Sequence, residues 1–220
     1  MSAARYERKT LKDVIRDAIY DAMISGELKP GDRIIEMEWA ARFSASQAPV
    51  REAIRDLEAR GVLDVVPYKG AVVRLFEQEK MKEIHAIRGG LEAAALTKVI
   101  KTVSDEDVSF LKAVFDEMVK AAEAGDVRTF LDRDIEFHEK IVDLANMPDL
   151  KKMWNMCNIR LWTGYSTRFS KLDLIALAKN HEAVYRKIKA RDLTEIFETI
   201  SNHFNIVNAS MREEAETATN

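Results

Sequence analysis

The sequence contains little cysteine, glycine and proline, and it has no long uncharged apolar run. Its 220 residues include one Cys, eight Gly and four Pro. A single Cys cannot form an internal disulfide, which is typical of a reducing compartment. So few turn-forming residues disfavour an all-β fold. Neither a signal-peptide core nor a transmembrane stretch of about 18 apolar residues is evident, so we expect a cytoplasmic protein that does not contact a membrane.

The chain also lacks a strong excess of positive charge. It carries 34 Lys and Arg against 37 Asp and Glu, a formal net charge of −3. The two halves differ, however: residues 1–76 hold 13 basic and 12 acidic side chains, and residues 77–220 hold 21 and 25. The net charge therefore does not exclude a nucleic-acid partner for the first half. We expect two domains, 1–76 and 77–220, with a hinge near residues 73–78.

The first segment has the pattern of a small DNA-binding fold. Apolar residues at helical spacing predict helices over about 10–25, 36–43 and 47–60, with Gly61 ending the third. The β-branched runs 62–66 and 71–74 flank a turn at 67–70 and predict a hairpin. Three helices followed by a hairpin predict a winged helix-turn-helix.

The third helix would be the recognition helix, whose first residues enter the major groove. Arg51 can bind guanine or a phosphate, and Gln47 can pair with adenine. The candidate DNA contacts are Arg33, Ser46, Gln47, Ala48, Arg51, Arg55 and, in the wing, Lys69 and Gly70. The alternative is an ordinary solvated helix face, in which Arg51, Arg55 and Arg60 pair with neighbouring acidic residues. This alternative stays open because three helices and a hairpin also occur in protein-interaction modules.

Residues 26–73 carry a dense motif, GELKPGDRIIEMEWAARFSASQAPVREAIRDLEARGVLDVVPYKGAVV. This stretch resembles the winged-helix domain of GntR-type transcriptional regulators. The shared positions are Gly26, Leu28, Pro30, Gly31, Ser46, Pro49, Val50, Arg51, Glu52, Ala53, Gly61 and Gly70. Such regulators usually have Arg and Thr where this chain has Gln47 and Ala48, so we expect a different operator sequence and affinity.

The second segment predicts an all-α antiparallel bundle. Helical periodicity indicates six helices, over about 77–101, 105–124, 127–146, 149–170, 173–190 and 192–213. Because the linkers between them are short, successive helices should pack antiparallel. The predicted fold class is thus mainly α, a winged helix-turn-helix followed by a helical bundle.

Three of the four His fall on apolar helix faces. Asp134 and His138 are four residues apart, and His181 and His203 each lie in an apolar row of a later helix. A buried unpaired Asp is costly, and a divalent metal would satisfy all four groups together; such a donor set suits Zn, Ni, Fe or Mn. The alternative is that each His is a hydrogen-bonded core residue. His85 is expected at the surface or an interface, and Cys157 in the core.

The stretch FLDRDIEFHEKIVDLANMPDL, followed by His181 and His203, resembles the FCD ligand-binding domain of FadR-type GntR regulators, and six helices resemble the VanR subgroup. The resemblance implies that Asp134, His138, His181 and His203 bind a divalent metal, with Zn the first expectation. Arg88, whose alternative role is an ion pair with Glu92, fits an Arg-x-x-Leu-Glu element of these domains and suits a small carboxylate effector. Weaker effector-binding candidates are Arg160, Tyr165 and Asn208.

These patterns together predict a metabolite-responsive transcriptional regulator and not an enzyme. We expect a repressor that binds a pseudo-palindromic double-stranded DNA operator as a homodimer, associated with the nucleoid of a bacterial cytoplasm, and that responds to a small organic acid. A metal-free regulator with another effector remains the main alternative. A metalloenzyme on a helical bundle is disfavoured because no paired Glu-x-x-His motifs and no second acid cluster accompany Asp134.

Overall fold

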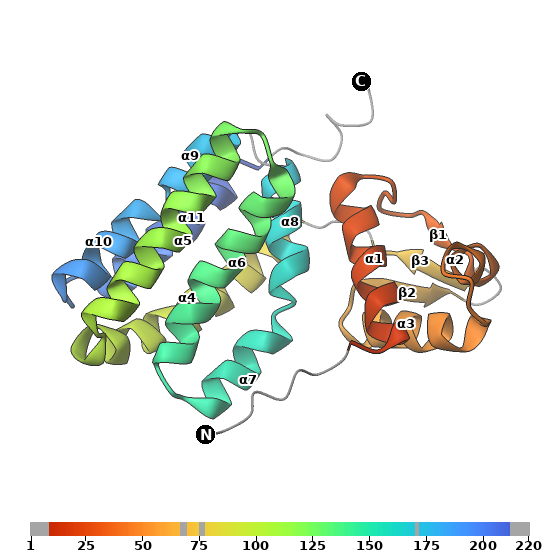
Figure 1. The fold of residues 1–220 in the computed structure, drawn as a ribbon, viewed down its shortest axis with the longest axis horizontal. Coiled ribbons are helices and arrows are strands. Elements are labelled where there is room, and N and C mark those ends of the chain that lie inside the picture. Colours follow the sequence, from red (N-terminus) through yellow and green to blue (C-terminus); the bar gives the residue numbers. More distant parts are fainter. Residues whose placement is uncertain (1–8, 67–69, 75–77, 170–171, 212–220) are drawn as a thin grey trace. The chain divides into compact units, whose positions relative to one another are not determined.

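The computed structural model describes residues 9–66, 70–74, 78–169 and 172–211 (Figure 1). The chain divides into two compact units, residues 1–76 and 77–220. Within the described ranges, none of the helices is both long and apolar enough to cross a lipid bilayer.

The first unit has the predicted winged helix-turn-helix architecture. Its helices are α1 (Leu11–Ser25), α2 (Glu36–Arg42) and α3 (Gln47–Ala59), and its strands are β1 (Arg33–Ile34), β2 (Leu63–Val66) and β3 (Gly70–Val73). The strands form one antiparallel sheet in the order β1-β3-β2, with Leu63 opposite Val73 and Ile34 opposite Ala71. Strand β1 was not predicted, because two residues are too few to show an alternating pattern.

Local sequence signals explain where the first helices begin and end. Thr10 caps α1 in a reciprocal capping box with Asp13, and Gly26 ends α1 in the left-handed conformation at φ 82°. Ser46 occupies the N-cap of α3, as predicted, and Gly61 follows the helix at φ 68°. The inner face of α3 is fully buried at Val50 and Leu57, so the opposite face is left for solvent or a partner.

The second unit is the predicted helical bundle. Its elements are α4 (Gln78–Thr102), α5 (Asp105–Glu123), α6 (Val127–Leu144), α7 (Pro148–Met156), α8 (Ile159–Phe169), α9 (Leu174–Lys179), α10 (Glu182–Ala190) and α11 (Ile196–Ala209). Helix α4 packs against α6 and α11, and α5 packs against α6, α9 and α10. Those contacts enclose the apolar core and the buried histidines.

Two of the six predicted bundle helices are each broken in two, so these predictions were wrong. The 149–170 helix is interrupted at Asn158, which adopts φ 48°, a left-handed conformation that Asn tolerates better than most residues. The 173–190 helix is interrupted at Asn180 and His181, where His181 N–H bonds to Ala178 O, a tighter turn than the α-helical one. The last helix begins at Ile196 and not at 192, because Glu195 is left-handed at φ 54°.

Gly89 lets α11 approach α4 closely beneath the histidine cluster. A Cβ at Gly89 would lie 3.3 Å from Phe204 Cδ2, whereas a Cβ at the next residue, Gly90, would meet nothing within 4 Å. Gly89 is buried and Gly90 is exposed. The close packing of α4 and α11 therefore depends on the missing side chain at Gly89.

We predict that Gly89→Val destabilises the protein by about 1–3 kcal/mol, because its γ carbons would displace the Phe204 ring. Gly90→Val is the matched control and should change stability by less than about 0.5 kcal/mol, since only helix propensity alters. Urea unfolding followed by circular dichroism measures both variants. Equal losses at the two positions would contradict the close approach.

Candidate functional site

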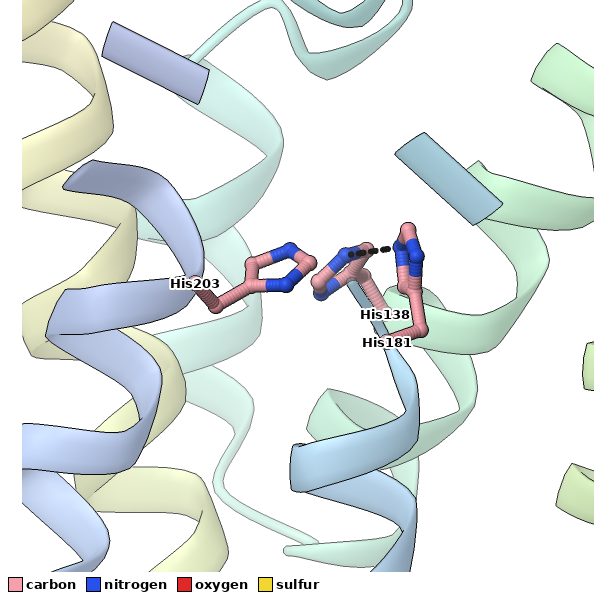
Figure 2. A group of neighbouring side chains, drawn as sticks. All are labelled: His138, His181 and His203. Atoms are coloured by element: carbon pink, nitrogen blue, oxygen red, sulfur yellow. Dashed lines mark hydrogen bonds between the residues drawn. The ribbon is translucent and has the colours of Figure 1, made fainter. Parts of the chain in front are cut away.

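Three histidine side chains from different parts of the second unit converge in its core (Figure 2). His138 lies on α6, His181 at the N-cap of α10 and His203 on α11. Each side chain offers a ring nitrogen that lies within 4.8 Å of those of the other two. All three residues are buried, with 5% or less of their surface exposed. The structure thus brings together three of the four predicted metal ligands.

Hydrogen bonds fix which nitrogen of each ring faces the centre. His138 Nδ1 lies 2.7 Å from Glu92 Oε2, and His181 Nδ1 lies 3.1 Å from the carbonyl oxygens of Leu177 and Ala178. Carboxylates and carbonyls only accept hydrogen bonds, so each Nδ1 must be the protonated nitrogen. A neutral ring then has its lone pair on Nε2.

The third ring follows the same rule. His203 Nδ1 lies 3.3 Å from the carbonyl oxygen of Asn180, whose own side-chain amide donates back to His203 O at 2.8 Å. Burial, followed by the neighbouring His181 and His138, holds the pKa of His203 well below its usual value, so this ring is neutral. Each ring therefore keeps a proton on Nδ1 and turns Nε2 toward the other two, and a cation would bind Nε2 in place of any proton that it carries.

The fourth predicted ligand, Asp134, lies one turn before His138 on α6. Its Oδ1 is 3.1 Å from His181 Nε2, and its buried Oδ2 has no hydrogen-bond partner. Burial alone would raise the pKa of Asp134, but the hydrogen bond from His181 and the nearby positive groups lower it well below its usual value. Asp134 is consequently an ionised carboxylate with one oxygen left over.

Glu92 on α4 is a member of this site that the sequence analysis named only as a partner of Arg88. Its carboxylate accepts from His138 Nδ1, from Trp154 Nε1 at 2.8 Å and from Arg88 Nε at 3.2 Å. Burial opposes ionisation, but the charges of His138 and Arg88 lower the pKa of Glu92 to about 2. A carboxylate behind a ligand histidine orients the ring and increases its basicity. The spacing of Arg88 and Glu92, four residues apart, was the available signal.

Arg88 faces the same cavity as the histidines. It is 2% exposed, and its Nη1 donates to Thr163 Oγ1 at 3.3 Å. Its Nη2 lies 3.2 Å from Glu92 Oε1 but in a geometry that leaves this nitrogen without a hydrogen bond. The cavity that Arg88, Asp134 and the histidines line has a volume of about 30 Å³, which is about the share of one water molecule in the liquid.

The other effector-binding candidates do not line this cavity. Arg160 is half-buried and pairs with Asp132 at 2.9 Å, Tyr165 is buried beside Trp162, and Asn208 bonds to His85. Helical position alone did not place them, because a helix row does not reveal which neighbour lies opposite it, and their role in effector binding stays a prediction.

His85 is in the core and not at the surface or an interface, which corrects the prediction. It is 2% exposed, and its Nδ1 lies 2.6 Å from Asn208 Oδ1 on α11. Its Nε2 lies 3.1 Å from Ser166 Oγ. Burial and the charge of Arg88 lower the pKa of His85 to about 4. This ring is therefore neutral and forms part of the cavity wall.

We predict that His85 makes the metal-free protein sensitive to acid. The unfolded chain binds a proton at His85 near pH 6.5, whereas the folded chain resists it until about pH 4. Protonation of His85 therefore has no effect on the free energy of unfolding well above pH 6.5. As the pH falls from 6.5 toward 4, this free energy decreases by up to about 1.4 kcal/mol per pH unit. Urea unfolding with a chelator present, between pH 7.5 and 5, should show a shallower decline for His85→Gln than for the native chain. Parallel declines would refute the prediction.

The predicted DNA contacts that the structure describes are all at least partly exposed. Arg33, Ala48, Arg55 and Gly70 are exposed, and Gly70 opens β3 at φ 79°. The Ser46 hydroxyl makes no cap hydrogen bond and is also exposed. Arg51 is 56% exposed at its side chain. Lys69 lies outside the described residues, so only part of the predicted contact set is placed.

Comparison with known proteins resolves which family has this combination of units. The model of the bacterial regulatory proteins of the gntR family matches residues 11–73, and the FCD domain model matches residues 83–206. The chain belongs to the GntR family. It is a DNA-binding transcriptional regulator with an FCD domain, as its named relatives are regulators.

Individual relatives agree with this assignment. A probable D-xylose utilization operon transcriptional repressor of Paenarthrobacter nicotinovorans is 30% identical over 191 residues, covering 87% of this chain and 84% of its own. The gluconate operon transcriptional repressor of Bacillus subtilis is 25% identical, covering 84% and 78%. The structure of McbR/YncC from E. coli shares the fold at a TM-score of 0.72 and 23% identity, covering 92% and 95%.

Proposed function

We propose that this GntR-family regulator is a metal-dependent repressor that responds to a small carboxylate, binds a pseudo-palindromic operator as a homodimer and acts in the bacterial cytoplasm. Two of its relatives are named as transcriptional repressors, which supports repression over activation. The observation that supports metal-dependent sensing is that three histidine ring nitrogens lie within 4.8 Å of one another, beside an Asp134 Oδ2 atom that has no hydrogen-bond partner.

The chemistry of the donor set supports a divalent metal. His138 Nε2 and His181 Nε2 are 3.2 Å apart, and two lone pairs at that distance repel unless a proton or a cation lies between them. A single proton between them would leave Asp134 Oδ2 without a partner, whereas one cation would serve all four groups. Three imidazoles and one carboxylate suit Zn, Ni, Fe or Mn, and Zn is our first choice.

The balance of buried charge supports an anionic effector. Metal-ligand histidines are neutral, and with all the histidines neutral the buried formal charges among the described residues of the second unit are Arg88, Glu92 and Asp134, a net charge of −1. A divalent cation would reverse this to +1, and one monocarboxylate would then neutralise it. Arg88 Nη2 is a buried donor without an acceptor beside the same cavity. A carboxylate there would accept from Arg88 while a bound metal supplies a Lewis-acid contact to its oxygen.

The small cavity supports a coupling between effector binding and shape. A volume of about 30 Å³ holds about one water, so even a three-carbon acid must displace side chains. His85 and Phe204 separate this cavity from a groove of about 810 Å³ between α4 and α11. Displacing either ring would alter contacts between α4 and α11, because His85 lies on α4 and Phe204 lies on α11. An effector regulates DNA binding only if it binds one of two arrangements more tightly.

We predict that the native protein binds about one equivalent of divalent metal per chain and that His181→Ala binds almost none. His85→Ala is the matched control, because His85 is as buried as His181 but is not a ligand; it should retain metal. Elemental analysis of protein reconstituted with Zn²⁺ and desalted measures this. Stoichiometric metal in His181→Ala, or none in the native chain, would favour the metal-free regulator.

We predict that Arg51→Ala weakens binding to the operator by about 1–3 kcal/mol, or roughly 5- to 150-fold. Arg60→Ala removes the same charge at the far end of α3, where Arg60 pairs with Asp56, and should change affinity much less. The operator is first selected from a random duplex library with the native protein. Electrophoretic shift at fixed salt then compares the variants, and equal losses for both would refute the assignment of Arg51.

A further inference from the structure

Arg51 on the recognition helix is held by two neighbouring side chains. Its Nε donates to Glu36 Oε2 at 2.6 Å, and its Nη2 donates to Gln47 Oε1 at 2.8 Å. Glu36 is the first residue of α2 and Gln47 is the first residue of α3. The guanidinium is thus bound along one edge by residues that begin the two helices of the helix-turn-helix.

The remaining edge of Arg51 is left for a partner. A guanidinium has five N–H donors in a rigid plane, and Glu36 and Gln47 use the pair formed by Nε and the adjacent Nη2 hydrogen. The end of the fork, formed by Nη1 and the second Nη2 hydrogen, makes no hydrogen bond with a described residue. Because the Arg51 side chain is 56% exposed, this end is accessible to a pair of acceptors.

The same contact changes what Gln47 can recognise. Arginine only donates, so the Gln47 atom that faces Arg51 must be the carbonyl oxygen. Bidentate pairing with adenine needs that oxygen to accept from the N6 amino group. While Gln47 holds Arg51, one of the two lone pairs of its carbonyl oxygen is occupied, so pairing with adenine would have to share this oxygen with Arg51.

We propose that Glu36 and Gln47 are positioning residues that orient Arg51, so that the end of its fork binds two acceptors on the operator. Guanine O6 and N7 or two oxygens of one phosphate present this acceptor pair. The proposal rests on Arg51 being a DNA contact. It also explains why Gln47 stands where similar regulators usually have Arg. An Arg at position 47 could not accept a hydrogen bond from Arg51, because arginine has only donors.

The competing outcome is that Glu36 only masks the charge of Arg51. A carboxylate near DNA repels phosphate, so its removal would then strengthen binding to every sequence. Positioning predicts the opposite for the specific site, because a freely rotating Arg51 must lose more conformational entropy when it binds. The ratio of non-specific to specific dissociation constants separates the two outcomes, as masking leaves this ratio unchanged.

The test is a double-mutant cycle on the full chain. Glu36→Ala and Gln47→Ala should each lower the specificity ratio about tenfold, and neither should have a further effect when Arg51 is already Ala. Glu38→Ala is the matched control: it lies in the same first turn of α2, is exposed, and loses the same charge. It should leave the ratio unchanged, and Glu36→Gln, which keeps an acceptor for Arg51, should retain most of it.

Each result has a definite meaning. An unchanged ratio for Glu36→Ala, a ratio equal to that of Glu38→Ala, or additive losses in the Arg51→Ala background would overturn the positioning role. If Arg51→Ala itself binds the operator normally, the DNA-contact assignment fails instead. Operators with 7-deazaguanine at single positions identify the acceptors: loss of the coupling at one base assigns guanine, and its retention at every base assigns phosphate.

Discussion

Three imidazole rings in the core of the second unit turn a nitrogen each toward one another. Such an arrangement is unfavourable by itself, and the surrounding structure holds it in place. Glu92 fixes the ring of His138, carbonyl oxygens at the end of α9 fix His181, and Asn180 fixes His203. Arg88 in turn balances Glu92. The interruption of the helix at Asn180 and His181 serves the same arrangement, because His181 follows this turn into the cluster while its Nδ1 binds carbonyl oxygens at the end of α9.

In each of the two units, a carboxylate orients a neighbouring side chain through a hydrogen bond. In the second unit, Glu92 binds the rear nitrogen of His138 and leaves Nε2 toward the centre. In the first, Glu36 binds the rear edge of Arg51 and leaves the end of its fork toward solvent. In both cases a carboxylate orients a neighbouring group that we propose binds a ligand. Orienting a side chain before binding reduces the entropy that the binding event must supply.

Periodicity and local turn signals predicted most of the fold. Val50, Ile54 and Leu57 mark the inner face of α3, and the four-residue spacing of Asp134 and His138 places both in one site. The predictions that were wrong concern features that depend on contacts between residues distant in the sequence. Asn158 and His181 break helices whose apolar pattern continues through the break, and His85 is buried by Ser166 and Asn208, neither of which is near it in the chain. The periodicity of a sequence does not identify such distant partners. For the same reason it did not predict the pairing of Arg51 with Glu36.

The most direct test of the account is a crystal structure of the protein loaded with Zn²⁺, with anomalous diffraction recorded at the zinc edge. We expect one anomalous peak per chain, bonded at about 2.1 Å to Nε2 of His138, His181 and His203 and to the Asp134 carboxylate. Nδ1 of each ring should keep its present acceptor. A peak bonded through Nδ1, a peak elsewhere in the chain, or no peak in loaded crystals would contradict the account.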